Sequence, residues 1–240
     1  MNTGERDELI FKLVFSREHD GFLRNPGGNI ANGAIVPDNT TLRMMGDDDL
    51  QALAVRANLV KSPSNFKADC EIFSDNVWVG VSLKSTRGEP ASILNHTHRK
   101  NMMAVCNRVG VNFPLFDNLV NIYHARRKAG LIGEDVRNDN PNSPFGDHPE
   151  ILIPIYAYFT CRGSGRGDSP RPATVIGVIN NPFDSDQGID YHDAEDYIRS
   201  QWPHIICSMR NHKSYTSSQE NQAWEVSHGG IIKPQFHVRI

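Results

Sequence analysis

Cysteine is scarce in this sequence, and the spacings that bind structural zinc are absent. The four cysteines lie far apart, and no two of them have the Cys-x-x-Cys spacing of a zinc ribbon. They are Cys70, Cys106, Cys161 and Cys207. We therefore expect four free thiols in a reducing compartment, not disulfides or a zinc site.

Long apolar runs are also lacking. No stretch approaches the roughly 18 apolar residues that are needed to cross a membrane. The opening segment, MNTGERDELIF, has neither the basic nor the apolar region of a signal peptide. These absences predict a cytoplasmic protein that does not contact a membrane.

A strong charge of either sign is missing, since the formal net charge is only -3. A DNA-binding protein needs positive charge on one face only, and carboxylates that hold a metal offset its lysines and arginines. Net charge therefore does not decide the function. Hydrophobic residues make up 38% of the 240 residues, enough for a core in one large domain or two small ones.

Apolar periodicity and the positions of glycine and proline predict the elements. The expected helices cover residues 3–16, 47–60, 91–109, 115–129 and 193–200. The expected strands cover residues 68–73, 77–84, 151–161 and 173–179, and residues 224–226 and 231–240 form a final hairpin. A polar segment, 133–149, is the expected subdomain boundary.

One predicted hairpin brings an acid and a lysine together. Side chains alternate between the faces of a strand, so Ser82 and Lys84 share one face, opposite Val81 and Leu83. A three-residue turn at 74–76 places Asp69, on the partner strand, near Lys84. A carboxylate binds a hard divalent cation, and a lysine can orient the attacking water and neutralise developing charge. An ordinary surface hairpin with an Asp–Lys pair is the alternative.

These residues resemble a known nuclease core. Ala68-Asp69 followed by Ser82-Leu83-Lys84 looks like the PD-(D/E)xK motif, with Ser82 where the second acid usually stands. The chain is also similar to the HpaII-type restriction endonucleases. The similar segments are Thr3 to Leu9, Gly80 to Ser85, Pro90 to Asn95, and Lys233 to Ile240.

The resemblance implies an α/β (α+β) fold, with a restriction-endonuclease-like mixed central sheet flanked by helices and a mainly β C-terminal part. Residues 1–132 would be the catalytic core and 150–240 the DNA-recognition part, packed on the same sheet or forming one domain with it. The implied function is Mg²⁺-dependent hydrolysis of double-stranded DNA at a specific short site, such as a GC-rich palindrome. The implied partners are a second copy of the chain and, functionally but not physically, a cognate DNA methyltransferase in a prokaryotic cytoplasm.

Carried over by position, Asp69 would be a metal ligand and Lys84 the catalytic lysine. Glu8, and with less support Glu5, would be the acid that the first helix contributes to the site, although acids at a helix start also simply complement its dipole. Glu5 and Glu8 lie one helical turn apart, so their side chains can face the same way.

The acid missing at Ser82 has a second candidate source in the hairpin itself. Glu71 lies on the same face of the expected strand as Asp69. Glu89, in the loop after the lysine, is the weaker candidate. The expected catalytic set therefore includes Asp69, Lys84, Ser82, Glu71 and Glu8, with Glu5 as a further metal ligand.

Three further segments are candidates for DNA contact. The first segment follows the strand that ends in Lys84 and contains Asn95, His98 and Arg99. A His-x-His metal site or a His-Asn-His nuclease fragment is the less favoured interpretation of this segment, because no second ligand cluster accompanies it. The other two segments contain basic side chains, which are Arg162, Arg166, Arg171, Arg210 and Lys213. Each of them could equally be part of a solvated loop.

Two alternatives to a sequence-specific restriction enzyme stay open. One is a non-specific or structure-specific nuclease of the same superfamily. The other is a non-catalytic DNA-binding protein, which the serine at position 82 keeps in consideration because the site is short of one acid.

Overall fold

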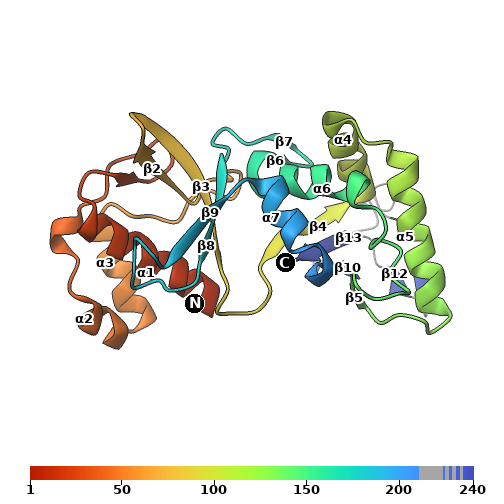
Figure 1. The fold of residues 1–240 in the computed structure, drawn as a ribbon, viewed down its shortest axis with the longest axis horizontal. Helices are drawn as coiled ribbons and strands as arrows, with labels where there is room; N and C mark the ends of the chain where they lie inside the picture. The colour runs from red at the N-terminus through yellow and green to blue at the C-terminus, as the bar shows by residue number, and fades with distance from the viewer. Residues whose placement is uncertain (211–223, 225–226, 229–230, 233–234) are drawn as a thin grey trace. The chain divides into compact units, whose positions relative to one another are not determined.

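The computed structural model describes residues 1–210, 224, 227–228, 231–232 and 235–240. The chain forms two compact units (Figure 1). The first contains residues 1–91 and 169–194, and the second contains residues 92–168 and 195–240. Among the described residues, no helix combines the length and the apolar character that crossing a bilayer requires.

The first unit has a five-stranded mixed sheet in the order β1-β2-β3-β8-β9. Neighbouring strands are antiparallel except β3 and β8, which are parallel. The strands are β1 (Leu23–Arg24), β2 (Cys70–Ser74), β3 (Val77–Ser85), β8 (Val175–Ile179) and β9 (Ile189–His192). The helices are α1 (Thr3–Glu18), α2 (Asn39–Met44) and α3 (Asp47–Arg56).

Helix α1 has a well-defined start and a buried apolar side. Asn2 is its N-cap, and Asn2 and Glu5 form a capping box, which satisfies free N–H groups of the first turn. Phe11, Leu13 and Val14 are buried in one core with Val81 and Leu83 of β3 and with residues of β2 and α3. This core holds α1 against the sheet, so side chains on the partly buried edge of α1 lie close to the strands.

The turn between β2 and β3 sets the register of the hairpin. Asp75 and Asn76 both have positive φ, 50° and 64°, and Ser74 pairs with Val77. The turn is therefore a two-residue one, not the three-residue turn predicted, and its conformation suits the right-handed twist of a hairpin. In this register Cys70 pairs with Val81, which places Asp69 beside the last third of β3.

The second unit has its own four-stranded sheet in the order β4-β13-β10-β5, antiparallel at each pairing. Its larger strands are β4 (Ser92–His98), β10 (Ile206–Arg210) and β13 (Gln235–Arg239), and β5 is Asp135–Arg137. Its helices are α4 (Arg99–Val109), α5 (Phe113–Lys128), α6 (Pro149–Ala157) and α7 (Ala194–Ser200). Two short two-stranded ribbons complete it: β6 (Gly163–Ser164) with β7 (Gly167–Asp168), and β11 (Ser227–His228) with β12 (Ile231–Ile232).

The mixed α and β fold class and the mixed sheet are confirmed, but several elements differ from the predictions. Residues 151–161, expected as a strand, form helix α6 and a π-helical turn, Tyr158–Arg162. Most of the helix after Glu150 is buried, and a continuous apolar run of this length does not distinguish a buried helix from a buried strand. Residues 92–98, expected to be helical, form strand β4 because they pair with β13.

The unit boundaries also differ from those predicted. The chain does not divide within 133–149; it crosses between the units near residues 91, 168 and 194. The reason is the parallel pairing of β3 with β8, which brings residues 169–194 back to the N-terminal unit. The assignment of catalysis to 1–132 and DNA recognition to 150–240 stays a prediction. The four cysteines are free, as expected, and all are buried.

Candidate active site

Asp69 lies in a bend immediately before β2, and its side chain is fixed to the neighbouring strand. Its Oδ2 accepts a hydrogen bond of 2.9 Å from the backbone N–H of Leu83, and its own backbone N–H donates to the carbonyl of Val81 at 2.8 Å. The carboxylate is thus held next to the residue that precedes Lys84. Its second oxygen is left to accept another donor or a cation.

Lys84 stands at the end of β3 and is half-buried. Its Nζ donates to Ser82 Oγ at 3.0 Å and to the Leu83 carbonyl at 2.8 Å. Ser82 is almost completely buried, with 2% of its surface exposed. The Ser82 hydroxyl, which has no charge to offer a metal, thus accepts a hydrogen bond from Lys84.

Glu8 approaches the hairpin residues from α1. Burial is the main cause that raises the pKa of its carboxyl to about 7. The positive charges of Lys84 and Lys12 oppose this rise, and the negative charge of Asp69 adds to it. A carboxyl that responds to both Lys84 and Asp69 lies in the same local environment as both. The structure thus brings together Asp69, Lys84 and the first-helix acid Glu8.

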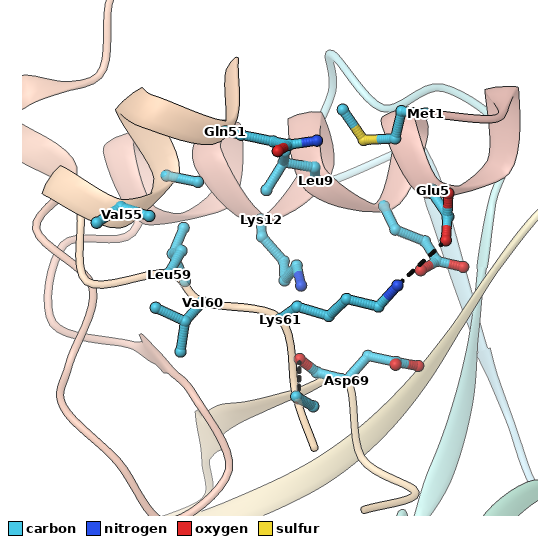
Figure 2. A pocket seen from close by; sticks show the side chains of 13 residues that line it. Met1, Glu5, Leu9, Lys12, Gln51, Val55, Leu59, Val60, Lys61 and Asp69 are labelled. Atoms are coloured by element: carbon cyan, nitrogen blue, oxygen red, sulfur yellow. Dashed lines mark hydrogen bonds and ion pairs between the residues drawn. The ribbon is translucent and has the colours of Figure 1, made fainter. Parts of the chain in front are cut away.

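A cavity of about 610 Å³ opens beside these residues. It lies between α1, α3 and the segment before β2, and both Glu8 and Asp69 line it. Figure 2 shows Glu5 at the upper edge of this pocket and Asp69 below it. Glu5 is occupied by an ion pair with Lys61, with Nζ 3.3 Å from Oε1, and by its capping contact with the backbone of Asn2. Glu5 is therefore a weaker candidate ligand than Glu8.

The carboxylate of Glu71 is bound by residues that do not line this cavity. Its Oε2 accepts from Arg24 Nε at 2.6 Å and from the backbone N–H of Gly27 at 3.1 Å, and Arg171 lies 4.0 Å from its other oxygen. These partners occupy the Glu71 carboxylate, and Glu71 is not among the residues that line the cavity. Of the two candidate sources for the second acid, the structure brings Glu8 to Asp69 and not Glu71.

Lys12 was missed by the sequence analysis. It follows Glu8 by one helical turn and lines the same cavity, although only 8% of its surface is exposed. The signal that could have identified it is a lysine inside the otherwise apolar run Leu9 to Phe15, four residues after an acid.

The candidate DNA-contact residues of the second unit fall into two groups. Arg99 forms a two-pronged ion pair with Asp117, at 2.9 and 2.7 Å, and lies over the Phe113 ring. His98 is buried, with its Nε2 2.7 Å from Gln235 Nε2, and Arg210 pairs with Asp135 at 3.1 Å. These side chains are engaged within their own unit.

The second group is exposed. Arg162 ends the π-helical turn, Arg166 lies in the turn between β6 and β7, and Asn95 accepts a hydrogen bond from Ser92 Oγ on β4. Lys213, with the rest of the segment after Arg210, lies outside the described residues. Of the recognition candidates, Arg162 and Arg166 keep exposed guanidinium groups that could contact phosphates.

The donor set of the site suits a hard divalent cation. Asp69 and Glu8 offer carboxylate oxygens, which Mg²⁺ prefers, and Mg²⁺ commonly uses one or two carboxylates and completes its shell with water and substrate. Within the described part of the chain no three His, Cys, Asp or Glu side chains are grouped to hold a metal. Burial raises the pKa of Glu8, and a cation bound beside this carboxylate would favour its charged form.

Comparisons with known proteins add little to this geometry. No family model and no curated protein sequence matches the chain. Among solved structures, a crystal structure of restriction endonuclease MspI in complex with its cognate DNA is similar, with a TM-score of 0.36 and 14% sequence identity. The similar region covers 75% of this chain and 65% of the MspI chain, less than two thirds of its length. A likeness at this TM-score assigns neither a fold family nor an activity to the chain.

Proposed function

We propose that this protein is a Mg²⁺-dependent DNA endonuclease of the type II restriction kind. The observation that carries the proposal is the meeting of Asp69 and Glu8 in one cavity beside Lys84. Two carboxylates can hold a divalent cation and a lysine can neutralise developing charge, so the three groups suit metal-assisted phosphodiester hydrolysis. The PD-(D/E)xK resemblance of residues 68–69 and 82–84 supports the same reaction class.

The roles of the residues follow from their contacts. Asp69 and Glu8 would hold the metal, which, when bound, polarises the phosphate and lowers the pKa of a water molecule. Asp69 is kept in position by the Leu83 N–H. The ammonium of Lys84 has three donors, of which Ser82 and Leu83 take two, so one N–H is left to orient the attacking water or a phosphate oxygen.

Sequence specificity is part of the proposal. We expect a short palindromic target in double-stranded DNA, bound by a two-fold dimer of the chain, because the symmetry of the protein mirrors that of its site. Exposed arginines such as Arg162 and Arg166 would contribute phosphate contacts, which fix register without reading bases. A DNA methyltransferase of the same specificity would protect the host genome, and both proteins would act in the cytoplasm of a prokaryote.

A second candidate function is DNA binding without cleavage. One observation favours it: buried Ser82 stands where the motif usually has an acid, and the described residues offer no third ligand side chain beside Asp69 and Glu8. A site with two carboxylates can still bind Mg²⁺ through waters and substrate oxygens. We therefore favour the nuclease.

Incubation of plasmid DNA with the purified protein, with Mg²⁺ or with EDTA, separates these functions. Discrete fragments that appear only with Mg²⁺ support a site-specific endonuclease. A Mg²⁺-dependent smear supports a nuclease without sequence specificity. Retarded but intact DNA under all conditions supports the binding protein and contradicts the proposed activity.

A further inference from the structure

Lys12 combines burial with the lack of a partner. Its side chain is more than nine-tenths buried, yet within the described part of the chain its ammonium has no hydrogen bond and no ion pair. Figure 2 shows the Lys12 nitrogen pointing from α1 into the cavity, on the side opposite Asp69.

Although Lys12 as a whole is almost buried, its Nζ is not among the fully buried, unpartnered polar atoms of the described residues. The end of the side chain therefore reaches the space of the cavity, where an ammonium can stay hydrated or meet an anion. The neighbours of Lys12 on α1, Phe11 and Leu13, are core residues, so an unbranched apolar side chain would suit this position better. The charge of Lys12 therefore does not contribute to core packing, and its ammonium is available to a ligand in the cavity.

The other lysines of the site are already engaged. Lys61 is 88% exposed at its side chain and pairs with Glu5, and Lys84 donates to Ser82 and Leu83. An anion that enters a cavity containing Glu8 and Asp69 meets two carboxylates and needs positive charge on the helix side as well as on the sheet side. Lys12 supplies that charge on the helix side.

We propose that Lys12 is a phosphate-binding residue, whose ammonium contacts a phosphate oxygen of the DNA strand that lies in this cavity. The inference rests on the proposed nuclease function and adds to it a second substrate-contacting lysine, on α1. The alternative is that Lys12 only balances the charge of Glu8.

The two roles differ in the salt dependence of DNA binding. Each phosphate neutralised by a lysine contributes about -0.9 to the slope of log K against log salt concentration. A residue that only balances Glu8 releases no counterions from the DNA and leaves this slope unchanged. The measurement is the affinity for a labelled double-stranded oligonucleotide at several salt concentrations, in EDTA, so that no cleavage occurs.

Lys12→Met keeps the length of the side chain and removes its charge. We expect it to weaken binding about tenfold and to make the slope shallower by about 0.9, whereas Lys12→Arg keeps the wild-type slope. Lys61→Met, which removes an equal charge from the same cavity, is the matched control and should change the slope by less. Circular dichroism verifies folding, and Lys12→Gln replaces Lys12→Met if the latter does not fold.

Three results would overturn the inference. The first is that the wild-type protein binds DNA and Lys12→Met keeps the wild-type salt slope. The second is that Lys61→Met changes the slope as much as Lys12→Met does. In either case Lys12 makes no specific phosphate contact, and the proposed nuclease function is unaffected. If the wild-type protein does not bind DNA at all, both the inference and the proposed function fail.

Discussion

The side chain of Asp69 is bound to the backbone N–H of Leu83, with 2.9 Å between Oδ2 and the nitrogen. This hydrogen bond ties Asp69, which immediately precedes β2, to the residue before Lys84 on β3. The position of the carboxylate relative to β3 is therefore fixed by a backbone group. A hydrogen bond to a charged acceptor is worth about 1.5–3 kcal/mol. The hairpin thus holds the carboxylate of Asp69, which lines the cavity, close to the strand that carries Lys84.

Lys84→Met should remove cleavage while sparing DNA binding. The substitution keeps most of the side-chain volume but loses the donor that would orient water or stabilise developing charge, and such losses cost roughly 100-fold or more in rate. Single-turnover cleavage and oligonucleotide affinity, measured on the same preparations, test this. Cleavage within a few-fold of wild type would remove Lys84 from the reaction.

Asp69→Asn should abolish stabilisation by Mg²⁺. A ligand that binds only the native state adds about 2.7 kcal/mol at a concentration 100 times its Kd. An asparagine still accepts the Leu83 N–H but is a poor ligand for Mg²⁺, so the variant should fold and show no shift. Thermal unfolding with Mg²⁺ or EDTA measures the effect. An equal shift in Asp69→Asn and wild type would place the metal elsewhere.

Glu8 should make the metal-free protein less stable as the pH rises. Its pKa is raised from the ordinary 4.5 to about 7 by burial. Between these values the folded state holds a proton that the unfolded chain has released, so its contribution to stability is present below pH 4.5 and is lost as the pH rises through 7. For this partly exposed group the loss is on the order of 1–2 kcal/mol.

Glu8→Gln removes this titration. In EDTA, the free energy of unfolding of Glu8→Gln should exceed that of wild type at pH 8, and the two should converge near pH 4.5. Urea denaturation at a series of pH values measures both. A wild-type protein that becomes more stable than Glu8→Gln as the pH rises from 5 to 8 would show that Glu8 is not destabilised by ionisation.

Arg99 and Arg166 should respond differently to replacement by alanine. Arg99 is held by Asp117 and Phe113, so Arg99→Ala should lower stability by about 1 kcal/mol and leave the salt slope of DNA binding unchanged. Arg166 is exposed in a turn, so Arg166→Ala should leave stability unchanged and weaken DNA binding. The reverse pattern would assign the DNA contact to Arg99.

Local sequence patterns predicted the hairpin and the first helix because their signals lie within a few residues. Alternation along β3 and the turn residues Asp75 and Asn76 specify a hairpin without any distant partner. Alternation alone did not distinguish Glu71 from Glu8 as the second acid. The partners of Glu71, Arg24 and the Gly27 N–H, come from another part of the chain, so no local pattern of the hairpin encodes them.

Elements that depend on distant partners were harder to predict. Strand β4 exists because β13, near the C-terminus, pairs with it, and β8 joins the first sheet through a parallel pairing with β3. Helix α6 looked like a strand because it is apolar on every side. Lys12 had a local signal, a lysine within an apolar helical run, but the packing of α1 is what places it beside Glu8 in the cavity.

The most direct test of the site is the Mg²⁺-dependent rate of DNA cleavage by Glu8→Gln and by Glu71→Gln. Both variants replace a buried or partly buried glutamate by its neutral isostere, and they differ in which acid they remove. If Glu8 is the second carboxylate beside Asp69, Glu8→Gln should lose at least roughly 100-fold in rate. Glu71→Gln, whose side chain pairs with Arg24, should then cut at nearly the wild-type rate. A Glu8→Gln variant that cuts normally beside an inactive, folded Glu71→Gln variant would contradict the assignment.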